Sequence, residues 1–234
     1  MELIEIKNLK KIYGKSLVID IPALEMKEGK IYSIIGNNGA GKTTLLRLIL
    51  DLLEANNGCV KINGRNVSNN EDWKLITNAY LDSDFLIDFL TVEEFILFIC
   101  EIYGISKKEM YSRMDVFKFF LGNEYAFKNK YITDFSSGDK QKTGILAAMI
   151  THPKILILDE PFNFLDPTSQ IEFKKLLSSF LNNNKTTIIL SSHNIDHILD
   201  VSSKIILMEN GSIIKEIENK SEIAKIELIN YFNA

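Results

Sequence analysis

Residues 34–46 read IIGNNGAGKTTLL, and this stretch decides the fold of the 234-residue chain. It satisfies G-x-x-x-x-G-K-[ST], follows a continuous apolar strand predicted over 31–35, and opens a helix with leucines spaced for one buried face. The glycines let the backbone wrap closely, so its N–H groups and the positive helix end can face a phosphate. Lys42 can reach the β- and γ-phosphates, and the Thr43 hydroxyl can ligate Mg²⁺. The predicted nucleotide-binding segment comprises Gly36, Asn37, Asn38, Gly39, Ala40, Gly41, Lys42, Thr43 and Thr44.

The composition is that of an ordinary globular chain, with 46% hydrophobic residues, 25% charged residues and a net charge of −4. It excludes collagen-like, disordered and mucin-like classes. The mild negative balance argues against bulk electrostatic binding of nucleic acid, so no nucleic-acid partner is expected. Cys59 and Cys100 lack metal-site spacing and are interpreted as reduced thiols. No apolar run is long enough to cross a bilayer, and no signal peptide is evident.

A second motif, KILILDEPFNFLD, spans residues 154–166. Four apolar residues place Asp159 at the carboxyl end of a buried strand, where ligands of α/β sheets bind. A carboxylate there can hold Mg²⁺ beside Thr43. Glu160 follows Asp159 directly, and successive side chains of an extended strand point in opposite directions. Glu160 is therefore expected to point away from the metal, towards the water that would attack the γ-phosphate.

Alternating strands and helices surround both motifs. Short strands are predicted at 3–6, 17–21 and 60–62, and the last of these turns at Asn63-Gly64. After Pro153 the alternation returns, with predicted strands at 155–158, 186–190, 205–208 and 212–217 and predicted helices at 169–181 and 195–200.

The sequence pattern between about residues 85 and 150 predicts helices and no strands. Capping boxes begin at Thr91 and Ser106, and the second opens a helix that continues to Leu121 and ends at Gly122. An apolar stripe on the first helix (Phe95, Phe98, Ile99 and Ile102) and the aromatic residues that follow are interpreted as core packing, with docking of a partner helix as the alternative. The tail at 221–232 has helical spacing and is expected to pack on the core, with a partner-binding helix as the alternative.

With both motifs placed, residues 1–217 resemble the ATP-binding subunit of an ABC transporter, most closely the drug, bacteriocin-immunity and ABC-2-type exporters. The family's signature, normally LSGGQ, is matched by FSSGDKQK at 135–142, with Gln141 at its second glutamine. The resemblance implies that Ser136, Ser137 and Gly138 contact the nucleotide of a second subunit. Ser136 and Asp139 form a plausible N-cap pair, which would leave a helix N-terminus able to face an anion.

Three further positions match motifs of the family, and they occur along the chain in the family's order. The resemblance implies that Tyr13 stacks on adenine, that Asp166-Pro167 begins the loop coupling two sites, and that His193 contacts the γ-phosphate. In the coupling loop, Asn163-Phe164 replaces the usual small residues. The expected Q-loop glutamine is absent between residues 80 and 90, and Asp82 is its best-aligned replacement, as a candidate to orient water or Mg²⁺.

The implied fold is α/β: a P-loop NTPase with a RecA-like parallel-sheet core, an N-terminal antiparallel β subdomain and an inserted α-helical subdomain. A single ABC ATPase domain is expected over 1–234. Its core lobe would span about 1–84 and 151–217, its helical insert about 85–150 and its C-terminal helical tail about 218–234.

The implied function is hydrolysis of ATP with Mg²⁺ in a head-to-tail dimer that powers a separate membrane permease, with a homodimer expected and export favoured. Lys42, Glu160 and His193 would be catalytic, and Thr43, Asp159 and Asp82 would serve the metal. The chain is expected to lie in the cytoplasm, on the inner face of the membrane. The alternatives are an ABC ATPase acting on ribosomes or DNA without a permease, a P-loop kinase or GTPase, and a catalytically weak family member.

Overall fold

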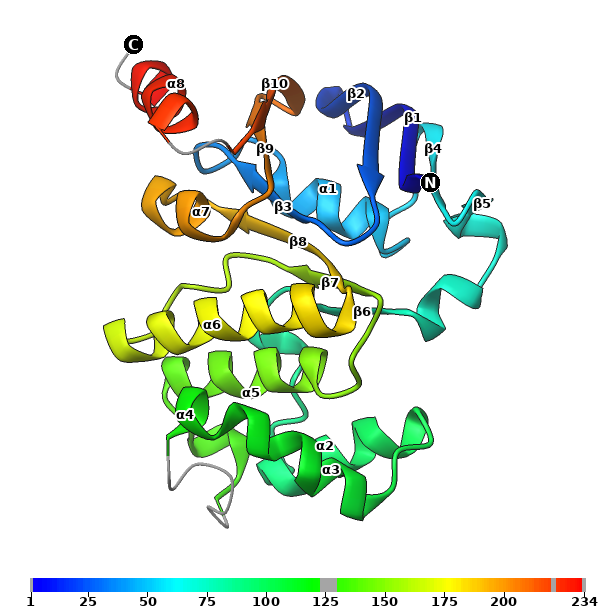
Figure 1. Ribbon diagram of the computed structural model, residues 1–234. Coiled ribbons are helices and arrows are strands. Elements are labelled where there is room, and N and C mark those ends of the chain that lie inside the picture. The colour runs from blue at the N-terminus through cyan, green and yellow to red at the C-terminus, as the bar shows by residue number, and fades with distance from the viewer. Residues whose placement is uncertain (1, 123–129, 220–221, 233–234) are drawn as a thin grey trace.

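The computed structural model describes residues 2–122, 130–219 and 222–232. Within these ranges an antiparallel sheet has the strand order β2-β1-β4-β5, and a larger sheet has the order β10-β9-β3-β8-β7-β6 (Figure 1). The antiparallel sheet comprises β1 (Glu2–Tyr13), β2 (Ser16–Lys27), β4 (Asn57–Ile62) and β5 (Arg65–Asn66). Asn63-Gly64, both with positive φ, turn β4 into β5, so the predicted hairpin is confirmed.

The larger sheet comprises β3 (Ile31–Ile35), β6 (Thr77–Tyr80), β7 (Ile155–Leu158), β8 (Thr187–Ser192), β9 (Lys204–Glu209) and β10 (Ser212–Glu218). Its strands run parallel from β9 to β6, and β10 pairs antiparallel with β9. Because both faces of a parallel sheet are covered, β7 is entirely buried. The carboxyl ends of these strands lie at one edge, so the segments after β3 and β7 become neighbours.

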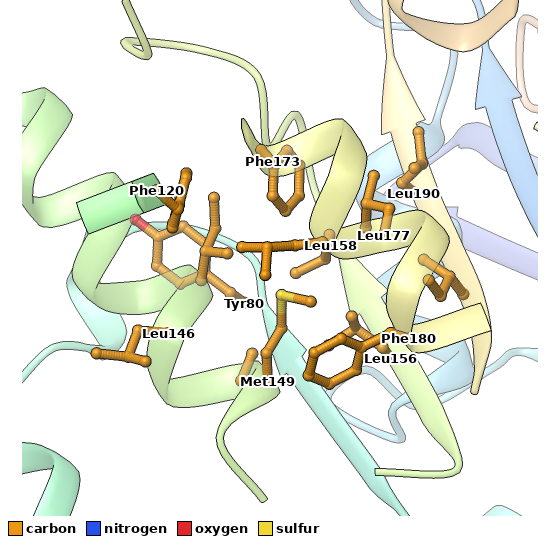
Figure 2. Packing of buried hydrophobic residues seen from close by; sticks show 14 of the residues in the cluster. Tyr80, Phe120, Leu146, Met149, Leu156, Leu158, Phe173, Leu177, Phe180 and Leu190 are labelled. Atoms are coloured by element: carbon orange, nitrogen blue, oxygen red, sulfur yellow. The ribbon is translucent and has the colours of Figure 1, made fainter. Parts of the chain in front are cut away.

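Alternate residues of β7 pack into two separate cores. Ile155 and Ile157 face one core, and Leu156 and Leu158 face the other. The first core lies between the two sheets and includes helix α1 (Lys42–Ile49), and the second lies under α5 (Ser137–Met149) and α6 (Pro167–Asn184). Figure 2 shows the second core, in which the β7 leucines meet Met149, Phe173 and Phe180.

Helices predicted in the middle of the chain are present. Helix α2 (Val92–Ile102) begins with a reciprocal capping box between Thr91 and Glu94, as predicted. The second predicted helix is divided into α3 (Lys107–Met114), a 3₁₀ turn and α4 (Lys118–Leu121), and it stops at Gly122 with φ 84°. Helices α7 (Ile195–Val201) and α8 (Glu222–Phe232) complete the fold, and Ala224 and Leu228 of α8 are buried against the core.

Two sequence expectations differ from the structure. Strand β6 was not predicted, because its four residues TNAY lack an apolar run and gain their burial from pairing with β7. Phe98 and Ile102 were expected in the buried stripe of α2 but are exposed, since Val92, Phe95, Ile96 and Cys100 form the buried face. Ser221, the first residue of the predicted tail helix, lies outside the described residues.

Candidate active site

The phosphate turn joins β3 to α1 in the predicted way. Gly41 has φ 99° and stands at the N-cap of α1, so the first N–H groups of the helix are not bonded by a capping side chain. An added Cβ on Gly36 would lie 2.3 Å from the carbonyl oxygen of Met208, so only glycine allows this close approach to β9. The turn is therefore an anion-binding cradle at a helix N-terminus.

Lys42 is buried at this turn, with 7% of its surface exposed. Its Nζ donates to the carbonyl oxygens of Gly36 at 2.8 Å and Asn37 at 3.3 Å. The ammonium is thus folded back along the turn whose N–H groups form the cradle. A lysine held at this position can reach phosphate oxygens bound in the cradle.

Asp159 and Thr43 meet across the edge of the sheet. The Thr43 hydroxyl donates to Asp159 Oδ2 at 2.5 Å, and the Ser191 hydroxyl donates to Oδ1. Burial raises the pKa of the Asp159 carboxyl, while the hydrogen bonds from Ser191 and Thr43 act in the opposite direction. A hydroxyl and a carboxylate are hard oxygen ligands of the kind that Mg²⁺ takes, so the pair fits that ion.

Glu160 lies between a lysine and a histidine. Its Oε1 is 3.5 Å from Lys42 Nζ, and its Oε2 is 2.9 Å from His193 Nδ1. The backbone N–H of Glu160 donates to Ser191 Oγ at 2.8 Å, and its φ is 45°. This positive φ lies outside the extended geometry from which the direction of the side chain was predicted. Lys42, Thr43, Asp159, Glu160 and His193 are therefore brought together in one cluster.

The signature residues begin α5. Ser136 is the N-cap: its Oγ accepts from the N–H of Asp139 at 3.1 Å and donates to the Asp139 carboxylate at 2.9 Å, so the predicted capping pair is present. Helix α5 packs on the opposite face of the sheet from α1. Ser137 lines a cavity of about 240 Å³ together with Asp159 and Glu160.

Two other predicted positions are Tyr13 and Asp82. Tyr13 ends β1 with 48% of its surface exposed, and Lys11 Nζ lies 5.1 Å from the centre of its ring. Asp82 lines the same 240 Å³ cavity but is paired with Arg47 of α1 at 3.4 Å, and it caps a 3₁₀ turn. In the parts of the chain that are described, no three His, Cys, Asp or Glu side chains gather as a metal-binding group.

The structure adds functional neighbours that sequence reasoning missed. Gln141 accepts from the Tyr80 hydroxyl at 3.2 Å and donates to the Pro161 carbonyl at 3.1 Å and to the Glu160 carbonyl at 3.4 Å. These bonds join β6, α5 and the segment that carries Glu160. In the sequence, Gln141 is recognisable only as a match to the family pattern. Nothing in the sequence pairs it with Tyr80, which is 61 residues away.

Comparison with known proteins identifies the family. The family model described as "ABC transporter" matches residues 19–163. A bacitracin transport ATP-binding protein (BcrA) of Enterococcus faecalis is 34% identical over 95% of this chain and 71% of its own length. A lantibiotic transport ATP-binding protein (SrtF) of Streptococcus pyogenes is 31% identical over 97% of this chain and 96% of its own length.

Solved structures agree on the fold. A structure described as an ATP-binding subunit of an ABC transporter superposes with a TM-score of 0.82 at 25% identity, over 97% of this chain and 99% of the other. A dimeric bacterial ABC transporter cassette, MJ0796, gives a TM-score of 0.83 at 22% identity, over 94% and 100%. Across the described ranges, no helix is long and apolar enough to span a bilayer. The chain therefore belongs to the ABC transporter family, as an ATP-binding subunit that hydrolyses ATP.

Proposed function

We propose that this chain hydrolyses magnesium-bound ATP between two head-to-tail copies and thereby drives a separate membrane subunit that exports its substrate. The observation that carries the proposal is the cluster at the edge of the sheet. Thr43 contacts Asp159 at 2.5 Å, and Glu160 is 3.5 Å from Lys42 and 2.9 Å from His193. These groups can hold phosphates, hold a metal and accept a proton within one site.

We propose a role for each of the predicted site residues. The backbone of 36–44 binds the phosphates, Lys42 neutralises charge on them, and Tyr13 stacks on the adenine. Thr43 and Asp159 would hold Mg²⁺, with Asp82 nearby, and the ion would offset charge on the β- and γ-phosphates. Glu160 takes a proton from the water whose oxygen bonds to the γ-phosphorus as the bond to the bridging oxygen breaks, which yields ADP and phosphate. His193 holds the Glu160 carboxylate in place.

Ser136, Ser137 and Gly138 would act on the nucleotide of the second copy. Helix α5 packs on the opposite face of the sheet from α1, and its N-terminus can bind an anion. A head-to-tail pair would bring each α5 to the other chain's ATP. In this proposal, a core lobe (1–84 and 151–217) carries the phosphate turn, a helical insert (85–150) carries the signature, and 218–234 forms a tail.

A group of exposed apolar side chains supports a membrane partner. Phe85, Phe89, Phe98 and Ile102 are exposed on or beside α2, next to a cavity of about 310 Å³ lined by Phe95, Ile99 and Tyr103. Contiguous exposed apolar surface of this kind marks interaction sites. The membrane subunit would dock here, so the chain would lie at the cytoplasmic face of the membrane. Export is favoured because bacitracin and lantibiotic transport proteins are relatives of this chain.

A co-purification experiment tests the proposal. Affinity purification from detergent extracts should recover a polytopic membrane protein with the chain, and I102S should lose that protein while keeping ATP binding. I171S, which changes another exposed isoleucine on α6, is the control that should retain it. Recovery of ribosomes instead of a membrane protein would contradict the transporter assignment.

A further inference from the structure

Ser191 is a buried serine near the end of β8, and its hydroxyl has two partners in the catalytic cluster. The hydroxyl donates to Asp159 Oδ1 and accepts the backbone N–H of Glu160 at 2.8 Å. Ser191 is fully buried, and Asp159 is only 7% exposed. Because water has little access to these atoms, loss of the hydroxyl would leave both partners with one hydrogen bond fewer.

The pairing of β7 with β8 explains why this serine meets the aspartate. The two strands pair in register up to Leu158 and Leu190, so Asp159 and Ser191 are the next residues along them. Side chains alternate between the faces of a strand, and the residues two places earlier on both strands pack in the core that includes α1. Asp159 and Ser191 therefore face α1, which carries Thr43.

The second partner of the hydroxyl is the backbone just after β7. The N–H of Asp159 donates to the carbonyl of Tyr80 on β6 at 3.0 Å, as in a continued parallel ladder. The next N–H belongs to Glu160, whose φ is 45°, and it donates to the Ser191 side chain instead of a backbone carbonyl. A residue other than glycine keeps such a conformation only when its surroundings hold it. The Ser191 hydroxyl is one of the contacts that do so.

We infer that Ser191 is a positioning residue for the reaction, because its one hydroxyl orients the Asp159 carboxylate and fixes the backbone of Glu160. The bond to Oδ1 leaves Oδ2 of Asp159 beside the Thr43 hydroxyl, at 2.5 Å, so Oδ2 is the oxygen that would ligate Mg²⁺. The inference rests on the proposed function, which assigns the metal to Asp159 and the proton transfer to Glu160. Groups that orient a metal ligand from behind change metal affinity or activity by about 10- to 100-fold when they are removed.

Calorimetry of the full chain with a non-hydrolysable ATP analogue, in Mg²⁺ and in EDTA, measures how much the metal adds to the affinity. S191A should reduce that gain by about 10-fold and lower phosphate release from ATP by about 10- to 100-fold. Its affinity in EDTA should equal that of the parent, because the phosphate turn is intact. S191T keeps a hydroxyl at this position and should recover most of both losses. If S191A does not fold, S191C takes its place, since a thiol of similar size forms only weak hydrogen bonds.

S33A is the matched control. Ser33 is also fully buried, on β3, and its hydroxyl bonds the Ser202 hydroxyl. The residues two places before and after it on β3 pack in the other core, so Ser33 lies on the opposite face of the sheet from α1. Both S191A and S33A should lower the urea midpoint of the chain in EDTA, because each loses a buried hydrogen bond. Only S191A should lose the gain in affinity that Mg²⁺ supplies.

The outcomes distinguish this inference from the proposed function. If Mg²⁺ adds nothing to the affinity of the parent, the proposed metal site is wrong and the role of Ser191 is wrong with it. If Mg²⁺ strengthens binding to the parent, and S191A keeps both that gain and the turnover of the parent, the proposed function stands and the positioning role is refuted. Equal losses in S191A and S33A, or no recovery in a folded S191T, would make packing rather than the hydroxyl responsible and would also overturn the inference.

Discussion

Replacing Gln141 by methionine tests whether the hydrogen bonds behind the catalytic segment stabilise it. Gln141 is 6% exposed, and its side chain bonds the Tyr80 hydroxyl and the carbonyl of Pro161. Burial raises the pKa of Tyr80 to about 12, so the phenol remains a neutral donor at working pH. Methionine keeps the volume but leaves two buried polar groups unpaired, at about 1–3 kcal/mol each. The expected loss of stability is therefore about 3 kcal/mol, which lowers Tm by about 6–12 °C in a chain of this size.

A double-mutant cycle supplies the decisive assay. Urea unfolding of Q141M, Y80F and the double variant should give a coupling free energy of about 1 kcal/mol, because the double variant removes both partners of one bond. ATP affinity should be unchanged, and turnover should fall, since the Glu160 carbonyl also loses a weaker bond. If the two substitutions add to within about 0.3 kcal/mol, the Tyr80–Gln141 bond does not stabilise the fold and the reasoning is refuted.

Two further predictions concern Glu160 and His197. E160Q should lower phosphate release at least ~100-fold while ATP binding persists, because the proton acceptor is lost and the phosphate turn is intact; weaker binding with normal turnover would contradict its role. Burial lowers the pKa of His197, whose ring stacks on Phe162 at 4.5 Å, and Lys174 adds to the shift. The unfolded chain therefore binds that proton more readily, so stability should fall as pH drops below about 6.5. H197F keeps the stack and should flatten this decline in urea midpoints between about pH 7.5 and pH 5; an unchanged pH dependence would be the contrary result.

The phosphate turn, the strand before Asp159 and the helix caps were predictable because each depends on residues that are close together in the sequence. The strand at 31–35 and the strand at 155–158 have the predicted bounds, and Asp159 and Glu160 follow the second strand as expected. Thr43 and Asp159 could be paired in advance because parallel strands end at one edge of a sheet. The capping residues Thr91 and Ser136 were also found, since capping depends on neighbours three positions along the chain.

Contacts between residues that are far apart in the sequence could not be predicted from it. Strand β6 is recognised only by its pairing with β7, and the pairing of Arg47 with Asp82 joins residues 35 positions apart in the sequence. The helical spacing in α2 predicted a buried face that includes Phe98, which is exposed. Which face of a helix is buried depends on the elements that pack against it, and the sequence of the helix does not show these. Gly144 illustrates the same limit, because a Cβ there would lie 2.0 Å from the Tyr80 ring, and only the fold brings them together.

The most direct test of the central claim is the affinity of the purified chain for ATP with Mg²⁺, measured by calorimetry for the parent and K42A. Lys42 should donate charge-assisted hydrogen bonds to the phosphates, so its loss should weaken binding by about 10- to 150-fold. K175A, which removes an exposed lysine paired with Glu172 on α6, should bind like the parent. An affinity unchanged in K42A, or no affinity for ATP in the parent, would contradict the account.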